Sequence, residues 1–380
     1  MIIFAPSYPL RGYFVQLNFF LCGLMKKPVV VLTALLLSCS LAFSQEADDT
    51  VSGVGFSLIP RLDFSPVFPA ESAKDLTLGN SSIYSLFEGS FLDERLTFSI
   101  ENHWLSASPA DLYVCEDEDG KRSANIFRSD NVNWLDWAYL SYTVAGFNFT
   151  VGKDCMMICG FEYDDYDFNV HPAIMSSVWN NFSPYQWGAK VGYTTPSENH
   201  EFAFQACASP YGERPFASKL FAYSFAWNGT FGAYSTRLTA TALQTDVKSF
   251  VPMISFGQKY EFDGGYACLD LFNCVETSDY ETSVWGITAM PSVCYSPIES
   301  VELFAKGGFE YDFNAESRKG GFFGGAGVHW YPLQDKSLRI HLLAAINHTP
   351  YSALANWDGV VRNYTVSIGA IYYLNFGILK

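Results

Sequence analysis

The chain has few basic side chains: 23 lysines and arginines against 39 aspartates and glutamates in 380 residues. A nucleic-acid partner needs a basic face, so this balance excludes one. The sequence also lacks a glycine-rich phosphate loop after a strand, a dinucleotide fingerprint and a metalloprotease helix motif. No His–Cys cluster has the spacing of a zinc site. We therefore expect neither an enzyme of these classes nor a bound cofactor.

The N-terminal apolar run is too short for a membrane-spanning helix. Met25-Lys26-Lys27 is a basic start, 28–37 is apolar over about ten residues, and small residues at Ala42 and Ser44 offer a cleavage site. This pattern predicts a secretory signal peptide over 25–44 and export to the outer membrane. Residues 1–24 precede the better start and are interpreted as an over-extended gene start. A rival outcome is lipid attachment at Cys39, in an imperfect lipoprotein box.

Removal of residues 1–44 makes the chain more acidic. It takes away Arg11, Lys26 and Lys27 but no acid, which leaves 20 basic and 39 acidic residues and a formal charge of −19. The aromatic content of 17% and a mean hydropathy near zero, +0.07, are unusual for a soluble enzyme. They suit a barrel with a lipid-facing band, aromatic girdles and a polar lumen.

From Val54 to Phe376 one unit repeats: about ten residues of alternating apolar and polar side chains, then a turn. Near the C-terminus, Tyr364, Val366 and Ile368 alternate with Thr365 and Ser367. A strand places successive side chains on opposite faces, so we expect the first set to face lipid and the second to face water. No linker divides residues 45–380, which predicts one domain.

The alternation predicts about sixteen strands, within a range of 14–18, and an all-β, transmembrane antiparallel β-barrel. Asn228-Gly229 is expected to be a tight turn, because both residues tolerate positive φ. Gly324 to Gly327 lies inside a strand, where glycines allow close backbone approach. The predicted strands are 56–64, 83–90, 96–104, 134–143, 147–153, 185–194, 201–207, 220–227, 234–243, 253–262, 266–273, 283–295, 301–311, 322–331, 338–348 and 363–376.

Charged residues of both signs fall on the predicted lumen face. A ring of one sign would favour one class of ion, so the mixture predicts a modest preference. These candidates are Arg61, Asp63, Glu101, Asp136, Lys190, Arg237, Lys259, Glu261, Glu302, Lys306, Glu310 and Arg339.

A long connection, 154–183, is rich in carboxylates. In a barrel wide enough to hold water, such a connection can fold inward and narrow the lumen. Asp154, Glu162, Asp164, Asp165 and Asp167 are the pore-constriction candidates. The alternatives are a calcium site built from these carboxylates or a solvated external loop.

Seven cysteines remain after signal removal, an odd number that leaves at least one thiol unpaired unless it bonds another chain. Cys155 and Cys159 could close a small disulfide or hold a soft metal. The alternative is that all are isolated small apolar residues. Among the histidines, His103 shares a strand face with Ser99, the minimum for a hydrolase pair, but no oxyanion or calcium motif accompanies it.

The stretch Trp134 to Tyr142, followed by Phe149-Thr150-Val151-Gly152-Lys153, resembles the porin superfamily that includes the phosphate-selective porins O and P. The next aromatic and acidic residues, 161–167, with Trp179 and 185–188, are similar to porin-like proteins of Bacteroides-type bacteria. The resemblance covers mainly 134–193. It implies a diffusion channel, either monomeric or a homotrimer, and does not imply phosphate, because the inward basic residues are sparse.

These features predict an outer-membrane channel that lets small hydrophilic solutes and ions diffuse, with outer-membrane lipids around it. The alternative is a non-conducting barrel that acts as an adhesin or scaffold through its loops. A third class is an outer-membrane lipid hydrolase. Single-channel conductance would discriminate between them.

Overall fold

The computed structural model describes residues 53–68, 76–77, 81–106, 114–116, 122–124, 135–182, 184–212, 216–276, 282–283, 286–313, 320–348 and 362–379, all within the compact unit 51–380. The predictions for residues 1–44, the signal peptide and the rival lipid site at Cys39, lie outside the described residues.

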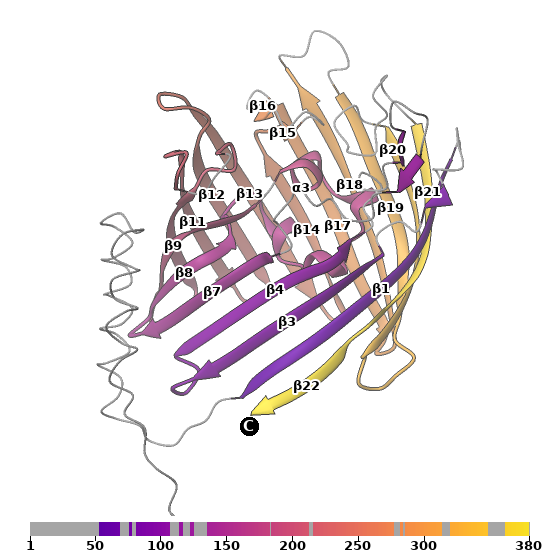
Figure 1. The fold of residues 1–380 in the computed structure, drawn as a ribbon, viewed down its shortest axis with the longest axis horizontal. Helices are drawn as coiled ribbons and strands as arrows, with labels where there is room; N and C mark the ends of the chain where they lie inside the picture. The colour runs from indigo at the N-terminus through magenta and orange to yellow at the C-terminus, as the bar shows by residue number, and fades with distance from the viewer. Residues whose placement is uncertain are drawn as a thin grey trace, which may run out of the picture. The chain divides into compact units, whose positions relative to one another are not determined.

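Sixteen strands form one closed antiparallel barrel, as the alternation predicted (Figure 1). Each strand pairs with the next along the chain, and the first pairs with the last. The walls are β1 (Val54–Phe68), β3 (Ser82–Phe91), β4 (Leu96–Ser106), β7 (Leu135–Val144), β8 (Phe147–Cys155), β9 (Tyr185–Thr194), β10 (His200–Ala208), β11 (Phe221–Phe231), β12 (Tyr234–Gln244), β13 (Phe250–Phe262), β14 (Gly265–Phe272), β17 (Gly286–Ile298), β18 (Val301–Asp312), β19 (Gly320–Trp330), β20 (Leu338–His348) and β21 (Arg362–Tyr372), which continues as β22 (Leu374–Leu379).

The barrel closes where the first strand, β1, pairs with the last, β21 and β22. β1 pairs with β21, with Phe64 opposite Ile368, and then with β22, with Phe56 opposite Phe376. The two-residue strand β2 (Leu76–Thr77) extends the edge of β1. Two small ribbons, β5 (Val114–Glu116) with β6 (Arg122–Ala124) and β15 (Val275–Glu276) with β16 (Thr282–Ser283), lie outside the wall sheet. No helix among the described residues is long and apolar enough to cross a membrane.

Turns at one end of the barrel are short, and connections at the other end are longer. Ala145 and Gly146 join β7 to β8 with φ values of 50° and 82°, the positive values that a two-residue hairpin turn requires. The short connection agrees with the predicted strands 134–143 and 147–153. The longer connections include the one between β8 and β9.

The turn predicted at Asn228-Gly229 is wrong. Both residues lie inside β11, and the chain turns at Gly232, which has a φ of +65°. Gly229 is paired with His200 on one side and Thr236 on the other. Ladder hydrogen bonds to two neighbouring strands outweigh the local turn preference of this dipeptide.

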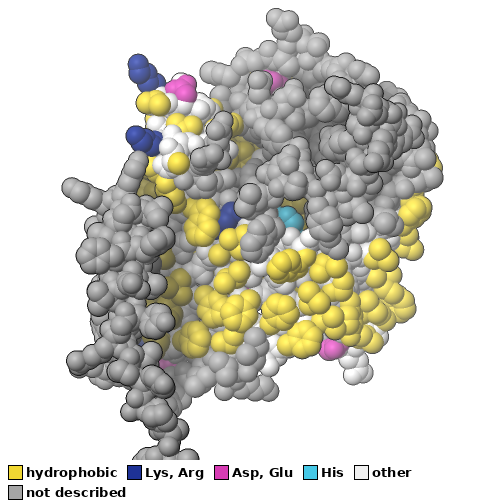
Figure 2. Space-filling view, in the orientation of Figure 1, with side chains coloured by type: hydrophobic (Ala, Val, Ile, Leu, Met, Phe, Trp, Pro, Cys, Tyr) yellow, Lys and Arg dark blue, Asp and Glu magenta, His cyan; other side chains and the backbone are white. Residues whose placement is uncertain are grey.

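The predicted register is confirmed. Tyr364, Val366 and Ile368 are exposed on the outside, whereas Thr365 and Ser367 are buried inside. The same alternation on the other strands gives a band of hydrophobic side chains on the outer surface (Figure 2). The interior is lined instead by charged and hydroxyl side chains, as a water-filled lumen requires.

The outer face is therefore intolerant of charge. Ile368, with 52% of its surface exposed, faces outward. We expect Ile368→Arg to lower the free energy of unfolding by about 2–4 kcal/mol, because a charge near the bilayer midplane loses its hydration. Ile368→Leu, the control, should change it by less than about 0.5 kcal/mol. Urea unfolding in lipid vesicles measures both, and equal losses would contradict the outward assignment.

Candidate functional site

The connection between β8 and β9 does not extend into solvent but folds into the barrel. It contains three short 3₁₀ turns, η3 (Phe161–Tyr163), η4 (Asp167–Asn169) and η5 (Pro172–Ile174), and one helix, α3 (Ser177–Asn181). Its apolar side chains form buried clusters with residues of the wall. We call residues 156–184 the inserted segment. It begins two residues later than the predicted constriction, because β8 continues to Cys155.

The start of the inserted segment is bonded to strands β10, β12 and β13. The Gln205 side chain accepts a hydrogen bond from the Met157 amide at 2.9 Å, and the Thr241 hydroxyl donates to the Met157 carbonyl at 2.8 Å. The Cys159 carbonyl accepts hydrogen bonds from the Ser255 and Thr239 hydroxyls. Wall side chains thus take the place of the strand partners that this backbone lacks.

At η3 the segment crosses to strand β14. The Asp270 carboxylate accepts a hydrogen bond from the Phe161 amide at 2.9 Å. A Cβ on Gly160 would lie 1.7 Å from that carboxylate, so only glycine fits there. The Arg237 guanidinium stacks on the Phe161 ring at 4.6 Å and pairs with Asp164 at 2.6 Å.

At η4 the segment reaches strands β1 and β20. Arg61 donates to the Phe168 and Val170 carbonyls at 2.9 and 2.7 Å, and pairs with Asp63 at 2.7 Å. Arg339 holds the neighbouring residue, since it donates to both the side chain and the backbone carbonyl of Asn169 at 3.1 Å. Together with Arg237, all three predicted lumen arginines are therefore bound to the inserted segment.

Three histidines meet where η5 packs on the wall. His171 of the inserted segment lies 3.1 Å from His329, measured between the Nε2 atoms. His329 contacts Glu302 at 2.7 Å through Nδ1, and His341 contacts Asp63 at 2.9 Å through Nε2. Each wall histidine thus has a carboxylate partner from the set of predicted lumen charges.

The far part of the segment is held by two buried glutamates. Glu162 accepts hydrogen bonds from the Ser176 amide at 2.8 Å and the Ser176 hydroxyl at 2.7 Å. Glu310 of β18 accepts from the Ser177 amide at 2.6 Å. Glu162 is fully buried and so does not present its charge to water, unlike the constriction acid that we expected. Its carboxylate fixes the turn before α3.

Asp154 and Asp167, two more of the predicted constriction acids, are also paired. Asp154 lies on β8 and pairs with Lys190 at 2.6 Å. The Tyr185 hydroxyl donates to Asp167 at 2.6 Å. The pKa of Asp167 is raised to about 7, mainly because the carboxyl group is buried and also because the Asp136 carboxylate lies nearby. Asp164 and Asp165 alone of the five are exposed.

Other predicted lumen residues pair within the wall. His103 contacts Asp136 at 2.6 Å, and Lys259 pairs with Glu261 at 2.9 Å. Glu101 is fully buried.

The structure does not bring His103 and Ser99 together as a hydrolase pair. The Ser99 hydroxyl donates to Glu88 at 3.1 Å and accepts from the Trp137 indole at 2.8 Å. The histidine instead contacts Asp136, as noted above. A serine nucleophile needs a histidine within hydrogen-bond reach, which this arrangement does not supply.

Cys155 and Cys159 are both free thiols. In the described part of the chain, no group of three or more histidine, cysteine or acidic residues is arranged to hold a metal ion. The positions of the acids in the inserted segment therefore do not support the alternative prediction of a calcium site.

Sequence reasoning missed several interior residues. Lys153 was not among the predicted lumen charges, yet it is buried and its ammonium donates to the Leu135 carbonyl. The alternation breaks one residue earlier, at Gly152, whose φ of +133° is closed to other residues. Asp270 and Gln205 were missed because their role depends on the inserted segment, which no local pattern reveals.

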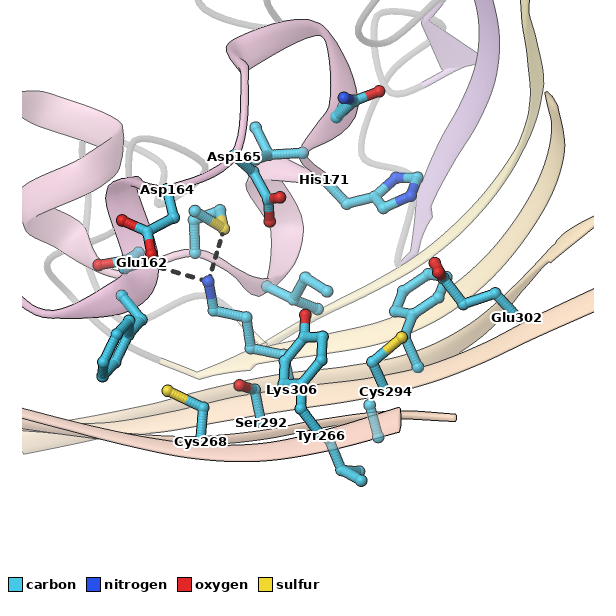
Figure 3. A pocket seen from close by; sticks show the side chains of 18 of the residues that line it. Glu162, Asp164, Asp165, His171, Tyr266, Cys268, Ser292, Cys294, Glu302 and Lys306 are labelled. Atoms are coloured by element: carbon cyan, nitrogen blue, oxygen red, sulfur yellow. Dashed lines mark hydrogen bonds and ion pairs between the residues drawn. The ribbon is translucent and has the colours of Figure 1, made fainter. Parts of the chain in front are cut away.

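Among the described residues, two cavities beside the inserted segment are both lined by Asp164 and Asp165. The larger, of about 360 Å³, lies between the segment and strands β13, β14 and β17 to β20 (Figure 3). The smaller, of about 160 Å³, lies toward β7, β8 and β9 and is lined by aromatic side chains such as Trp137 and Tyr166. The two exposed acids thus line both of these cavities.

Solved structures similar to this one are outer-membrane proteins. OmpT of Vibrio cholerae matches with a TM-score of 0.55 at 12% identity, over 86% of this chain and 99% of that one. A trimer form of that protein matches with a TM-score of 0.54 at 12% identity, over 85% and 100%. A porin of Rhodopseudomonas blastica carrying three mutations matches with a TM-score of 0.55 at 12% identity, over 84% and 100%. At such identity the likeness establishes the fold, that of a porin-like outer-membrane barrel.

No protein-family model matches the chain, and no curated protein matches its sequence. The resemblance to phosphate-selective porins therefore remains a prediction from the motif residues.

The Arg61 anchor gives a prediction for stability. Arg61→Met removes two hydrogen bonds to the inserted segment and breaks the buried ion pair with Asp63. We expect a loss of about 3–5 kcal/mol in the free energy of unfolding, the usual cost of breaking a buried pair. Arg95→Met, on an exposed turn, is the control and should cost less than about 0.5 kcal/mol. Urea unfolding measures both, and similar values would argue against the anchor.

Proposed function

We propose that the protein is an outer-membrane porin-like channel through which small hydrophilic solutes and ions diffuse passively. The observation that carries this proposal is the inserted segment, tied to strands around the barrel and bordered by two charge-lined cavities. A barrel of sixteen strands is wide enough for an aqueous lumen. In this proposal the inserted segment is the constriction that sets which solutes pass.

We place the channel in the outer membrane, with its lipids around the hydrophobic band. The fold likeness supports this location. We propose a homotrimer as its assembly, since one similar structure is a trimer form. The phosphate-selective porins remain the family proposed from the motif at 134–153.

The rival is a non-conducting barrel that acts as an adhesin or scaffold through its loops. Single-channel recording of refolded protein in planar bilayers discriminates between the two. Discrete current steps support the channel. A folded, heat-modifiable barrel that gives no current supports the scaffold. A lipid hydrolase is the weakest candidate, because Ser99 and His103 have other partners.

The channel should prefer cations modestly. Asp164 and Asp165 are exposed beside both cavities, and carboxylates at a narrow point concentrate cations. Changing both to asparagine removes two negative charges and leaves the positive charge of Arg237 without its partner. The reversal potential in a KCl gradient should therefore move toward zero. The control is Glu198→Gln with Asp263→Asn, which removes the same charge from exposed turns.

Salt provides an independent check of that preference. At about 1 M salt the Debye length falls to about 3 Å, so the wild-type preference should shrink. A wild-type preference for anions would overturn the assignment and favour the phosphate-porin resemblance, with Arg61, Lys190, Arg237, Lys259, Lys306 and Arg339 as its carriers.

Cation preference should also depend on pH. With its pKa raised to about 7, Asp167 is ionised above neutrality and neutral below it. We therefore expect the reversal potential to move toward zero between pH 8 and pH 6, as one negative charge disappears from the lumen. Asp167→Asn should remove most of that change. If the variant keeps the full pH dependence, another group is responsible.

A further inference from the structure

The larger cavity has the size of a binding site for a small molecule. Its volume of about 360 Å³ corresponds to roughly a dozen waters and falls within the usual range of ligand pockets. The inserted segment forms one side and the barrel wall forms the other (Figure 3). Any solute that crosses at this level meets both sides at once.

Two lysines of the wall, Lys306 and Lys259, line the cavity. The Lys306 ammonium lies 3.6 Å from Glu162 and 3.0 Å from the Met175 sulfur. A thioether is a weak acceptor, and the Glu162 oxygens already accept hydrogen bonds from Ser176. Lys306 therefore retains donor capacity for a better acceptor. Lys259, which also lines the cavity, lies 4.9 Å from the centre of the Tyr266 ring.

Carboxylates line the cavity from both the inserted segment and the wall. Asp165, on the inserted segment, points into it and is exposed (Figure 3). Among the residues that the structure describes, none forms an ion pair or a hydrogen bond with the Asp165 carboxylate. Glu302 of β18 also lines the cavity, and 29% of its side chain is exposed beside His329. Two carboxylates are therefore available to a cationic group.

A solute of one charge is attracted either by the lysines or by the carboxylates of this cavity and is repelled by the other set. A solute that carries both charges is attracted by both sets, because each end meets a partly desolvated group of opposite sign. We propose that the cavity binds a small zwitterion of the amino-acid type, its carboxylate toward Lys306 and its ammonium toward Asp165 and Glu302. This inference rests on the proposed channel function and names its solute class.

The test uses four molecules of matched size and different charge. Alanine is the zwitterion, propionate the anion, propylammonium the cation and propionamide the neutral analogue. Calorimetric titration into the refolded, detergent-solubilised barrel measures binding without requiring conduction. Block of single-channel KCl current by each molecule is recorded in parallel. We expect alanine to bind with a dissociation constant about tenfold or more below those of the other three, since they each lose at least one charged hydrogen bond.

Asp165 is the better residue to change, because its carboxylate has no hydrogen-bond or ion-pair partner among the described residues. We expect Asp165→Asn to weaken alanine binding about tenfold and to leave propionate binding unchanged or stronger. Asp165→Glu should restore binding in part. Glu198→Gln, on an exposed turn, is the matched control and should bind alanine as the wild type does.

Lys306 tests the other end of the ligand. Lys306→Met removes the partner of buried Glu162 and could shift the inserted segment, so Lys306→Arg accompanies it. Binding that is lost in the methionine variant and kept in the arginine variant supports the assignment.

The outcomes separate the two proposals. Alanine binding without KCl conductance keeps the zwitterion site and overturns the channel. Conductance with equal binding or block by all four molecules overturns the zwitterion site and keeps the channel. Unchanged alanine binding in Asp165→Asn also overturns the site as described.

Discussion

Closure of the sheet is the constraint on which the rest of this structure depends. Backbone amides and carbonyls inside a membrane have no water to bond, so every strand edge must find a partner. The first strand pairs with the last from Phe56 opposite Phe376 to Phe68 opposite Tyr364. Because the ring is closed, one face of every strand is outside and the other is inside. The apolar and polar alternation follows from that division.

The same constraint makes the inserted segment possible. A closed ring of sixteen strands leaves an interior too wide for wall side chains to fill, and the polar side chains that line it need partners. The segment supplies them: its carbonyls accept hydrogen bonds from Arg61, Thr241 and Ser255, and its amides donate to Gln205 and Asp270. The segment and the wall therefore satisfy each other's polar groups.

Glycine determines where the segment can approach the wall. A Cβ on Gly325 of β19 would come within 2.9 Å of the Ile174 side chain, and one on Gly257 would come within 2.9 Å of the Phe161 ring. Both positions face inward, where the missing side chain leaves room for the segment. The glycine-rich stretch of β19, which the sequence placed inside a strand, thus has a second role. Its inward face lacks bulky side chains there, so η5 can pack directly against the strand.

Features of the fold set by neighbouring residues in the chain could be predicted, whereas features set by contacts between distant residues could not. Side-chain alternation is local, so the barrel, its strands and the outward position of Ile368 could be read from the chain alone. The turn at Asn228-Gly229 was wrong because two neighbouring strands outweighed a local preference. Lys153 was missing from the predicted lumen residues because Gly152, with its positive φ, shifts the alternation after it.

The sequence by itself determined that the chain is a barrel with charges of both signs inside and an acidic connection after β8. It could not determine which of those charges remain open to water. Glu162 and Asp165 are three residues apart in the same acidic run, yet the first is buried against Ser176 and the second faces the larger cavity. That difference arises from contacts between residues distant in the chain, because only the folded segment decides which carboxylates find donors.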